Sequence, residues 1–155
     1  MSSIKVGTFR LVYFDKKDKE HLSYVKELLS DKAIVSKFQG IFPALVSKND
    51  FFNKGFFIKY KDEYVGCIIF GNYDSNEGCM YIRGFAVDKD HRGMKIGCEK
   101  LSQVAHDEIV KYIFNKYFYI DTIMITVSTE NPAGQKAAVR YGYSRISDTH
   151  YLMHR

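Results

Sequence analysis

Residues 85–97, which read FAVDKDHRGMKIG, have the residue types that an anion-binding turn needs. An apolar run that predicts a strand ends near Val87, a turn rich in glycine and cations follows, and a helix is expected next. The N-terminus of a helix offers unpaired N–H groups and a partial positive charge, and glycines let the main chain approach an anion closely. The stretch therefore predicts a phosphate site, with an ordinary strand–turn–helix connection as the alternative.

The glycine spacing of this turn excludes two common nucleotide motifs. It contains neither G-x-G-x-x-G nor G-x-x-x-x-G-K-[ST]. Three cations, Lys89, Arg92 and Lys95, add positive charge near the expected start of the helix. The whole chain has 23 Lys and Arg against 18 Asp and Glu, a formal charge of +5. This balance favours an anionic ligand such as a nucleotide, a coenzyme, nucleic acid or an acidic protein, or else reflects an ordinary solvated surface.

A second stretch, residues 129–143 (TENPAGQKAAVRYGY), predicts a short helix. Asn131 suits the N-cap, Pro132 the first helical position and Gly142 the position just past the end. Capping accounts for all three residues, so the stretch by itself indicates only a helix. Its place in the chain indicates more, because it follows a strand that itself follows the candidate anion-binding helix.

The elements that must position these two stretches can be predicted from the periodicity of apolar residues. Hairpins in the middle of the chain and helical crossovers later predict an α/β (α+β) fold with a mixed sheet, rather than a doubly wound parallel one. We expect strands at 8–14, 56–60, 64–70, 79–87, 121–128 and 151–155, helices at 18–30, 95–117 and 132–141, and short helices within 32–55.

Composition excludes several classes of protein. The chain has 155 residues, 46% apolar and 15% aromatic, which is too apolar for disorder and fits one domain over 1–155. No apolar run reaches the ~18 residues of a membrane helix, and the start lacks a secretion signal. Cys67, Cys79 and Cys98 are odd in number and form no C-x-x-C, which favours reduced thiols in a cytoplasm. His150 and His154 are interpreted as a surface pair, so no metal site is predicted.

Together the two stretches resemble the GNAT superfamily of acetyl-CoA-dependent acetyltransferases. RGMKIG at 92–97, after a strand ending in FAV, looks like the [QR]-x-x-G-x-[GA] motif that binds a pyrophosphate in that family. Asn131 with Gly142 and Tyr143 is similar to its N-x-x-[AS]-x7-G-[FY] segment. The element order agrees over nearly the whole chain. The resemblance implies a mixed, mostly antiparallel central sheet flanked by helices on both faces.

This sequence departs from the family pattern at three positions. Lys95 stands where the first motif usually has a second glycine, so that a side chain crowds the turn or adds a cation. Gly134 replaces the usual Ala or Ser of the second motif. Ala138 stands where many members have a Tyr proposed to protonate the leaving thiolate. Tyr141, three residues further on roughly the same helix face, is either its substitute or a core residue.

The resemblance implies which residues hold the coenzyme. Backbone groups of the strand that ends at Val87 would pair with the pantetheine arm like an added strand, and an N–H there would stabilise the oxyanion. The N–H groups of the following turn would hold the pyrophosphate. The implied cofactor-binding residues are Phe85, Ala86, Val87, Arg92, Gly93, Met94, Lys95, Ile96, Gly97, Asn131 and Lys136.

Transfer to an amine also requires proton transfer. An aliphatic amine with a pKa near ~10 is mostly protonated at neutral pH, so a base or a water chain must take its proton. We expect Tyr141 as the acid and Glu130 or Tyr81 as the base, with Asp88 and His150 as further candidates. Each of these residues also has an ordinary structural interpretation, as core packing or as a solvated surface group.

Two further expectations concern the same region. Tyr81 and Arg83 alternate with Phe85 along one strand, so we expect the three side chains to share a face and to line the cleft. Cys98 is interpreted as a packing residue at the start of the long helix. An acetyl-cysteine route would need a thiolate of low pKa, and no base is evident beside it.

The function implied by the resemblance is N-acetyl transfer from acetyl-CoA to a primary amine, directly within a ternary complex. The acceptor stays open between a small amine, a protein N-terminus or lysine, and an aminoacyl-tRNA, and a homodimer is left open. One alternative is a non-catalytic coenzyme A-binding or regulatory module, suggested by Lys95 and the missing Tyr. Another is a nucleic-acid-binding domain that uses the basic turn.

Overall fold

A computed structural model describes residues 3–15, 17–37, 55–73 and 76–155 of the chain. Short helices were predicted within 32–55: one is found at 32–37, and residues 38–54, like the turn at 74–75, lie outside the described residues. Eight strands form one sheet in the order β1-β2-β3-β4-β5-β8-β10-β9. They are β1 (Ser3–Val6), β2 (Phe9–Tyr13), β3 (Gly55–Tyr60), β4 (Glu63–Tyr73), β5 (Asn76–Val87), β8 (Thr122–Thr126), β9 (Ser144–Arg145) and β10 (His150–His154).

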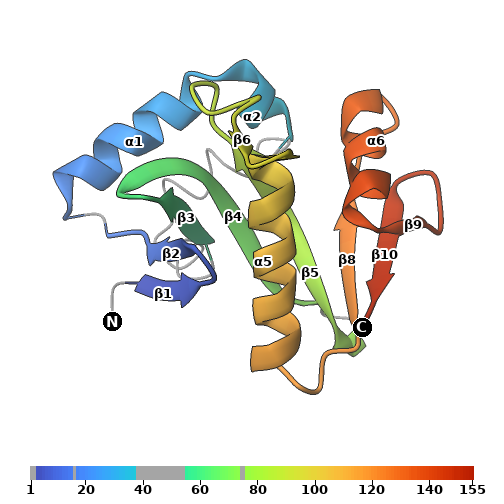
Figure 1. Cartoon of the computed structure of the whole chain (residues 1–155). Helices are drawn as coiled ribbons and strands as arrows, with labels where there is room; N and C mark the ends of the chain where they lie inside the picture. Colours follow the sequence, from blue (N-terminus) through green and yellow to red (C-terminus); the bar gives the residue numbers. More distant parts are fainter. Residues whose placement is uncertain (1–2, 16, 38–54, 74–75) are drawn as a thin grey trace.

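The sheet is mixed and mostly antiparallel, as predicted. Every neighbouring pair of strands in it is antiparallel except β5 and β8, which run parallel. The connection between these two strands is a long crossover through α5 (Leu101–Lys116), and it is this crossover that lets them run in the same direction. Figure 1 shows α5 lying across the sheet between its N-terminal and C-terminal parts.

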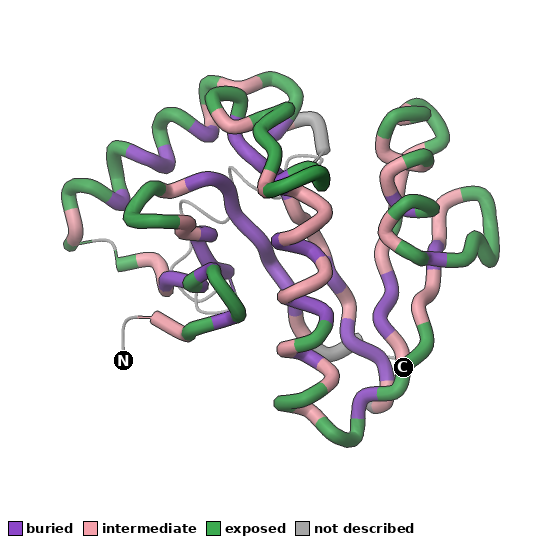
Figure 2. The backbone as a smooth tube through the Cα atoms, in the orientation of Figure 1, coloured by how far each residue is buried: buried purple, intermediate pink, exposed green. Residues whose placement is uncertain are grey.

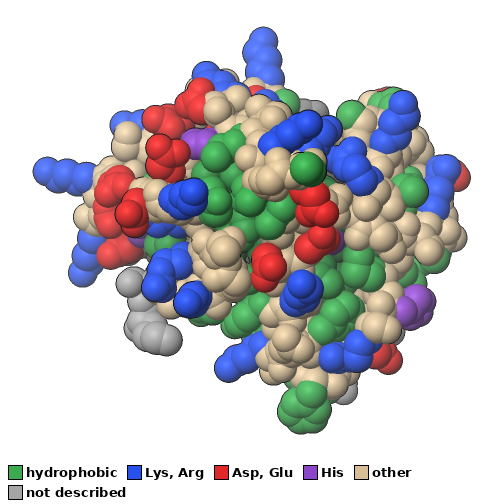
Figure 3. Space-filling model, viewed as in Figure 1, with side chains coloured by type: hydrophobic (Ala, Val, Ile, Leu, Met, Phe, Trp, Pro, Cys, Tyr) green, Lys and Arg blue, Asp and Glu red, His purple; other side chains and the backbone are tan. Residues whose placement is uncertain are grey.

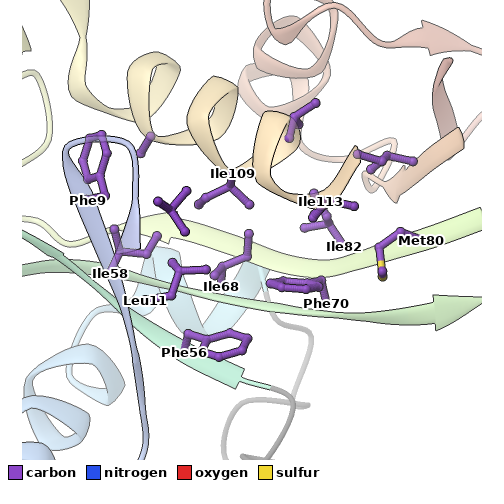
Figure 4. Packing of buried hydrophobic residues seen from close by; sticks show 14 of the residues in the cluster. Phe9, Leu11, Phe56, Ile58, Ile68, Phe70, Met80, Ile82, Ile109 and Ile113 are labelled. Atoms are coloured by element: carbon purple, nitrogen blue, oxygen red, sulfur yellow. The ribbon is translucent and has the colours of Figure 1, made fainter. Parts of the chain in front are cut away.

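Helices cover both faces of the sheet, which confirms the expected layers. One buried cluster packs α5 against the sheet through residues such as Leu11, Ile68 and Ile109, and Figure 4 shows this packing. A second cluster packs α1 (Lys19–Leu29) and α2 (Lys32–Lys37) on the other face, around Phe57 and Ala86. The tube in Figure 2 shows buried segments along the central strands and exposed ones at the turns and outer helix faces.

Local signals set most element boundaries. Asp18 caps α1 by accepting from the backbone of Glu20 and His21, as its predicted N-cap role requires. Tyr24 lies on the buried face of this helix, whereas Leu22 is 40% exposed. The hairpin between β3 and β4 closes through Lys61 and Asp62, which both have positive φ, the backbone that a tight two-residue turn needs.

The long helix begins later than predicted. Lys95–Ile96 (β6) and Glu99–Lys100 (β7) form a small antiparallel hairpin, and α5 starts only at Leu101. Gly97 has a φ of +63° at the turn of this hairpin, a backbone that breaks a helix and closes a tight turn. Cys98 is consequently exposed at the hairpin tip, so its predicted packing role is wrong.

The second predicted helix is confirmed as α6 (Pro132–Tyr141). Asn131 Oδ1 accepts from the backbone N–H of Gly134 at 3.0 Å, and Pro132 occupies the first turn. Gly142 ends the helix in the left-handed conformation, with a φ of +105°. The strand predicted at the chain end is β10, although β1, β9 and the β6–β7 hairpin were not predicted.

Candidate active site

The sheet opens between its two parallel strands. Residues Cys79–Ile82 of β5 pair with Thr122–Ile125 of β8, and within the described chain no pairing joins the two strands beyond that point. At the same place β5 contains a β-bulge, because Ile69 pairs with Gly84 while Phe70 pairs with Ile82, which leaves Arg83 as the extra residue. A bulge bends and twists its strand, and this bend turns β5 away from β8. Figure 1 shows the two strands diverging toward the end where α5 and α6 lie.

A cleft of about 480 Å³ occupies this opening. Its walls come from both strands, from α5 and from α6, so chain segments distant in sequence meet here. Its lining combines aliphatic and aromatic side chains with several polar or charged ones, and polar groups inside a concave site can orient a small-molecule ligand. The lining side chains include Phe85, His106, Thr126, Glu130, Ala138 and Tyr141.

Main-chain groups of β5 face this cleft. The N–H of Asp88 donates to the carbonyl of Val65 at 2.8 Å, so the backbone of Asp88 points toward β4. Successive residues of an antiparallel ladder point their hydrogen-bonding groups alternately toward and away from the neighbouring strand. With Val87 opposite Gly66 and Phe85 opposite Ile68, the backbone groups of Val87 and Phe85 point away from β4, to the open edge. The side chain of Ala86 is buried on the opposite face.

The bulge also corrects the expected facing of Tyr81. Met80 and Ile82 belong to the cluster under α5, and so do Val87 and Phe85, so the alternation shifts by one residue at Arg83. Tyr81 therefore lies on the face opposite to Phe85, so the prediction that these two share a face is wrong, whereas Arg83 and Phe85 both line the cleft as predicted. The Tyr81 hydroxyl lies 2.8 Å from Thr126 Oγ1 of β8, and this hydrogen bond spans the opening.

An aromatic wall closes the cleft on the α5 side. The ring of Tyr141 stacks on the imidazole of His106 with 4.3 Å between centroids and 9° between planes, and Phe85 meets both rings edge-on. The His106 Nε2 atom lies 2.9 Å from the hydroxyl of buried Tyr143. Tyr141 is partly buried: it packs against the core cluster under α5, as the core interpretation expects, and it also lines the cleft.

His106 is a site residue that the sequence analysis missed. Its Nδ1 has no hydrogen-bond partner among the described residues, and the Asp107 carboxylate is 3.7 Å away, beyond hydrogen-bond reach. Burial lowers the pKa of His106 to about 4, despite that carboxylate, so the imidazole is neutral at pH 7. An unpartnered buried polar atom costs about 1–3 kcal/mol. The only sequence signal was a histidine inside the apolar stripe of a helix.

The turn after β5 is held by charged and hydrogen-bonded side chains. The Tyr24 hydroxyl donates to Asp88 Oδ2 at 2.7 Å, and His91 bridges Asp88 Oδ1 at 2.6 Å and Glu63 Oε2 at 3.0 Å. Burial and the Asp88 carboxylate raise the pKa of Tyr24. Burial alone would lower the pKa of His91, but its two carboxylate partners raise it above the ordinary value. This network makes Asp88 a structural anchor outside the cleft.

The rest of the predicted anion-binding turn is exposed. A Cβ added to Gly93 or Gly97 would meet no described atom within 4 Å, and both glycines have positive φ. Met94 and Lys95 are also exposed, whereas Ile96 is partly buried against the α5 cluster. Figure 3 shows Lys and Arg side chains gathered over the hairpin. The surface of the turn is therefore open to an anionic ligand.

The structure brings some of the other candidates to the cleft and leaves others outside. Glu130 and Asn131 line it between β8 and α6, with the Asn131 amide oxygen engaged in the helix cap. His150 pairs in register with Thr126, and its Nδ1 lies 2.9 Å from the Thr149 hydroxyl. Lys136 is exposed on α6 and does not line the cleft.

A parallel pair of strands that separates at a bulge, with a glycine turn above it, defines the coenzyme-binding class of fold to which the acetyltransferases belong. The family model described as the Acetyltransferase (GNAT) family matches residues 22–143. The chain belongs to this family and is an acetyltransferase of the acyltransferase class, which confirms the predicted resemblance. No curated protein matches the chain.

Solved structures of acetyltransferases are similar to this chain in overall fold. An acetyltransferase of the GNAT family from Bacillus anthracis has a TM-score of 0.72 at 18% identity, covering 98% of each chain. An acetyltransferase from Thermus thermophilus has a TM-score of 0.70 at 14% identity, covering 98% of this chain and 100% of that one. The ribosomal L7/L12 α-N-protein acetyltransferase RimL, in complex with coenzyme A, has a TM-score of 0.65 at 15% identity, covering 98% and 97%.

The helices themselves add one negative finding. Among the described residues, no helix combines the length and the apolar character that crossing a membrane would require.

Proposed function

We propose that this protein transfers an acetyl group from acetyl-CoA to a primary amine, directly within a ternary complex. The observation that carries the proposal is the cleft between β5 and β8, which Phe85 lines, together with the main-chain groups of Phe85 and Val87 that point away from β4 along the open edge of β5. An extended amide chain can pair with such an open strand edge as an added strand would. The pantetheine arm of the coenzyme is a chain of this kind, so the cleft fits it.

The turn above the cleft fits the diphosphate of the coenzyme. Gly93 and Gly97 leave open space at their α-carbons, so an anion can approach the main chain there. The first turn of α5 presents N–H groups and carries no acidic residue, which also favours an anion. Lys95 and Arg92 bring positive charge. Lys95 does not have a positive φ, so the loss of the family glycine here causes no backbone strain.

The chain's own groups supply what acetyl transfer needs. Bound acetyl-CoA supplies an activated thioester carbonyl. The outward N–H of Val87 is a preorganised donor for the negative charge that develops on the carbonyl oxygen. Exclusion of water by the aromatic wall of Phe85, His106 and Tyr141 strengthens this hydrogen bond.

Proton transfer is assigned to groups at the cleft. Glu130 lines the cleft and takes the amine proton directly or through water. Tyr81, the second candidate base, does not line the cleft and would act only through Thr126, a lining residue whose Oγ1 lies 2.8 Å from the Tyr81 hydroxyl. Tyr141 gives its hydroxyl proton to the leaving sulfur and recovers one from the proton lost by the amine, so the proton count closes. Asp88 is excluded from this role by its network with Tyr24 and His91.

The acceptor is proposed only by class. A small amine, a protein α-amine or lysine, and an aminoacyl-tRNA all present a primary amine of suitable chemistry. The fold likeness to an α-N-protein acetyltransferase supports including protein N-termini among them. We also propose that residues 1–155 act as a single acetyltransferase-like domain, because all described strands except the β6–β7 hairpin join one sheet.

The test is release of free thiol from acetyl-CoA with pooled amines, amino acids, peptides and charged tRNA. Two variants at one position separate backbone strain from obstruction of the turn. G97A adds the strain of a side chain at positive φ, about 1–2 kcal/mol, with little bulk. G97L adds the same strain and blocks the approach of an anion. We expect G97L to weaken coenzyme binding at least tenfold beyond G97A in calorimetry, and equal affinities of the two variants would refute the assignment of the turn.

A further inference from the structure

His106 is the buried polar residue at the centre of the cleft wall. It is 2% exposed on α5, between Phe85 of β5 and Tyr141 of α6. Its Nδ1 lacks a hydrogen-bond partner among the described residues. An apolar side chain of similar size would avoid the free-energy cost of burying that unpaired nitrogen. Packing alone therefore does not account for an imidazole here.

The imidazole does something that an apolar ring could not do. Its face covers the ring of Tyr141 at a centroid distance of 4.3 Å, and its Nε2 is held 2.9 Å from the Tyr143 hydroxyl. This hydrogen bond fixes the plane of the imidazole, and the stacked contact passes that orientation to Tyr141. A phenyl ring would fill the same space, but it has no atom that Tyr143 could hold.

The electrostatic state of the imidazole agrees with this role. Because burial lowers the pKa of His106 to about 4, the imidazole adds no positive charge beside the Tyr141 ring at neutral pH, and the Arg140 guanidinium lies 5.6 Å from the centroid of that ring. The Asp107 carboxylate lies 3.7 Å from the imidazole Nδ1, and Gln103 donates to this carboxylate at 3.0 Å. The stacked pair is thus neutral and rigid, which suits a residue whose hydroxyl must be held in one place.

We propose that His106 is a positioning residue, which fixes the ring of Tyr141 in the cleft wall and is itself fixed by Tyr143. The proposal rests on the proposed function, in which Tyr141 protonates the leaving sulfur. His106 touches no reacting atom in this scheme and exchanges no proton. It acts only through the orientation of Tyr141.

The test compares H106F, Y141F and the double variant. We expect H106F to lower kcat about tenfold, a fraction of the 10²–10⁴ that a positioned acid contributes, with coenzyme Kd within about twofold of wild type. In the Y141F background the same change should have no further effect on kcat, because residues that act through one another are not additive. Full additivity, or an H106F kcat equal to wild type, would overturn the proposal.

A matched control separates positioning from simple packing. His21 is likewise buried among aromatic rings, Phe57 and Tyr64, but on the other face of the sheet. H21F should lower thermal stability while leaving kcat at the wild-type value. If H21F lowers kcat as much as H106F does, the effect at His106 is only structural.

A second variant keeps the proposal testable if H106F fails to fold or if no acceptor is found. Y143F removes one oxygen and leaves the His106 ring in place, so it should lower kcat in the same direction. It should also shift and broaden the NMR signals of the Tyr141 ring, a readout that needs no activity. Unchanged Tyr141 signals would overturn the positioning role, whereas an inactive wild type with the expected spectral change would refute only the proposed function.

Discussion

The Arg92 guanidinium lies 2.5 Å from Asp31 Oδ2, and this ion pair ties the turn after β5 to the connection between α1 and α2. Arg92 is the first residue of the predicted coenzyme motif, and its exposed side chain is paired with a carboxylate of the same chain. Burial alone would raise the pKa of Asp31, but the Arg92 hydrogen bond and backbone N–H groups lower it. The predicted anion-binding turn thus has a negative charge, Asp31, next to one of its cations.

Removing that negative charge should strengthen coenzyme binding. D31N keeps the shape of the side chain but releases the Arg92 charge, so the Kd for coenzyme A should fall severalfold at low salt. The gain should shrink at high salt, because exposed charges are screened. Calorimetry at two salt concentrations measures both effects, with D121N at the far end of α5 as the control. A Kd that rises in D31N would mean that the pair serves to hold the turn in shape.

The His91 bridge should make stability depend on pH near neutrality. Its folded-state pKa is raised, so protonated His91 stabilises the fold below the ordinary value of 6.5, and this stabilisation is lost as the pH rises through the raised value. H91Q should therefore be less stable than wild type at pH 5.5, by up to about 1 kcal/mol, and similar to it at pH 8.5. Urea unfolding across this range tests it, and a difference that grows with pH would contradict it.

His106 should give the opposite pH dependence. Its folded-state pKa is lowered to about 4, so the unfolded chain binds a proton more readily and stability falls as the pH drops from 6.5 toward 4. The loss from this one group is about 3 kcal/mol by pH 4. H106F lacks the group, so its stability should fall less steeply over the same range. Parallel unfolding curves for the two proteins would show that His106 is not held neutral.

Gly134 should be intolerant of alanine, although the family usually has Ala or Ser there. A Cβ at this position would clash with Asn131 Nδ2 and would lie 2.9 Å from Val127 Cγ1. An exposed helical glycine gains about 1 kcal/mol when replaced by alanine, but here the clash should displace the helix cap and cost about 1–2 kcal/mol. Thermal unfolding of G134A measures this, with V139A on the exposed face as the control. A raised Tm for G134A would contradict the tight packing of the cap.

Much of the fold could be predicted because its signals are local. The caps at Asp18 and Asn131, the left-handed end at Gly142 and the apolar periodicity of α5 all act within a few residues. The mixed sheet followed from the order of elements, and the crossover before β8 makes that strand parallel to β5. Each of these signals is contained in one stretch of sequence and does not depend on contacts with distant segments.

The site was harder to predict because it is formed by residues from segments that are distant in the sequence. The bulge at Arg83 turns Tyr81 to the face opposite Phe85. A prediction that assumes strict alternation of side chains along a strand does not include such a shift. Helix α5 begins at Leu101, later than predicted, because the hairpin through Gly97 competes with helix formation. The periodicity of apolar residues alone does not reveal that competition. His106 was missed since its partners, Tyr141 and Tyr143, come from α6 and the residues just after it.

Within the described chain, the C-terminal strands β8, β9 and β10 pair with the rest of the sheet through the short parallel ladder between β8 and Cys79–Ile82. A second tie is Arg155, which donates to the carbonyls of Phe114 and Tyr117 at the end of α5. Both ties lie at the end where β5 and β8 pair, and the contacts of His106 with Tyr141 and Tyr143 join α5 to the C-terminal part at the cleft. Hydrogen–deuterium exchange should be slowest at the β5–β8 pairing and at the end of α5. A ligand bound in the cleft between β5 and β8 should slow exchange in both strands together.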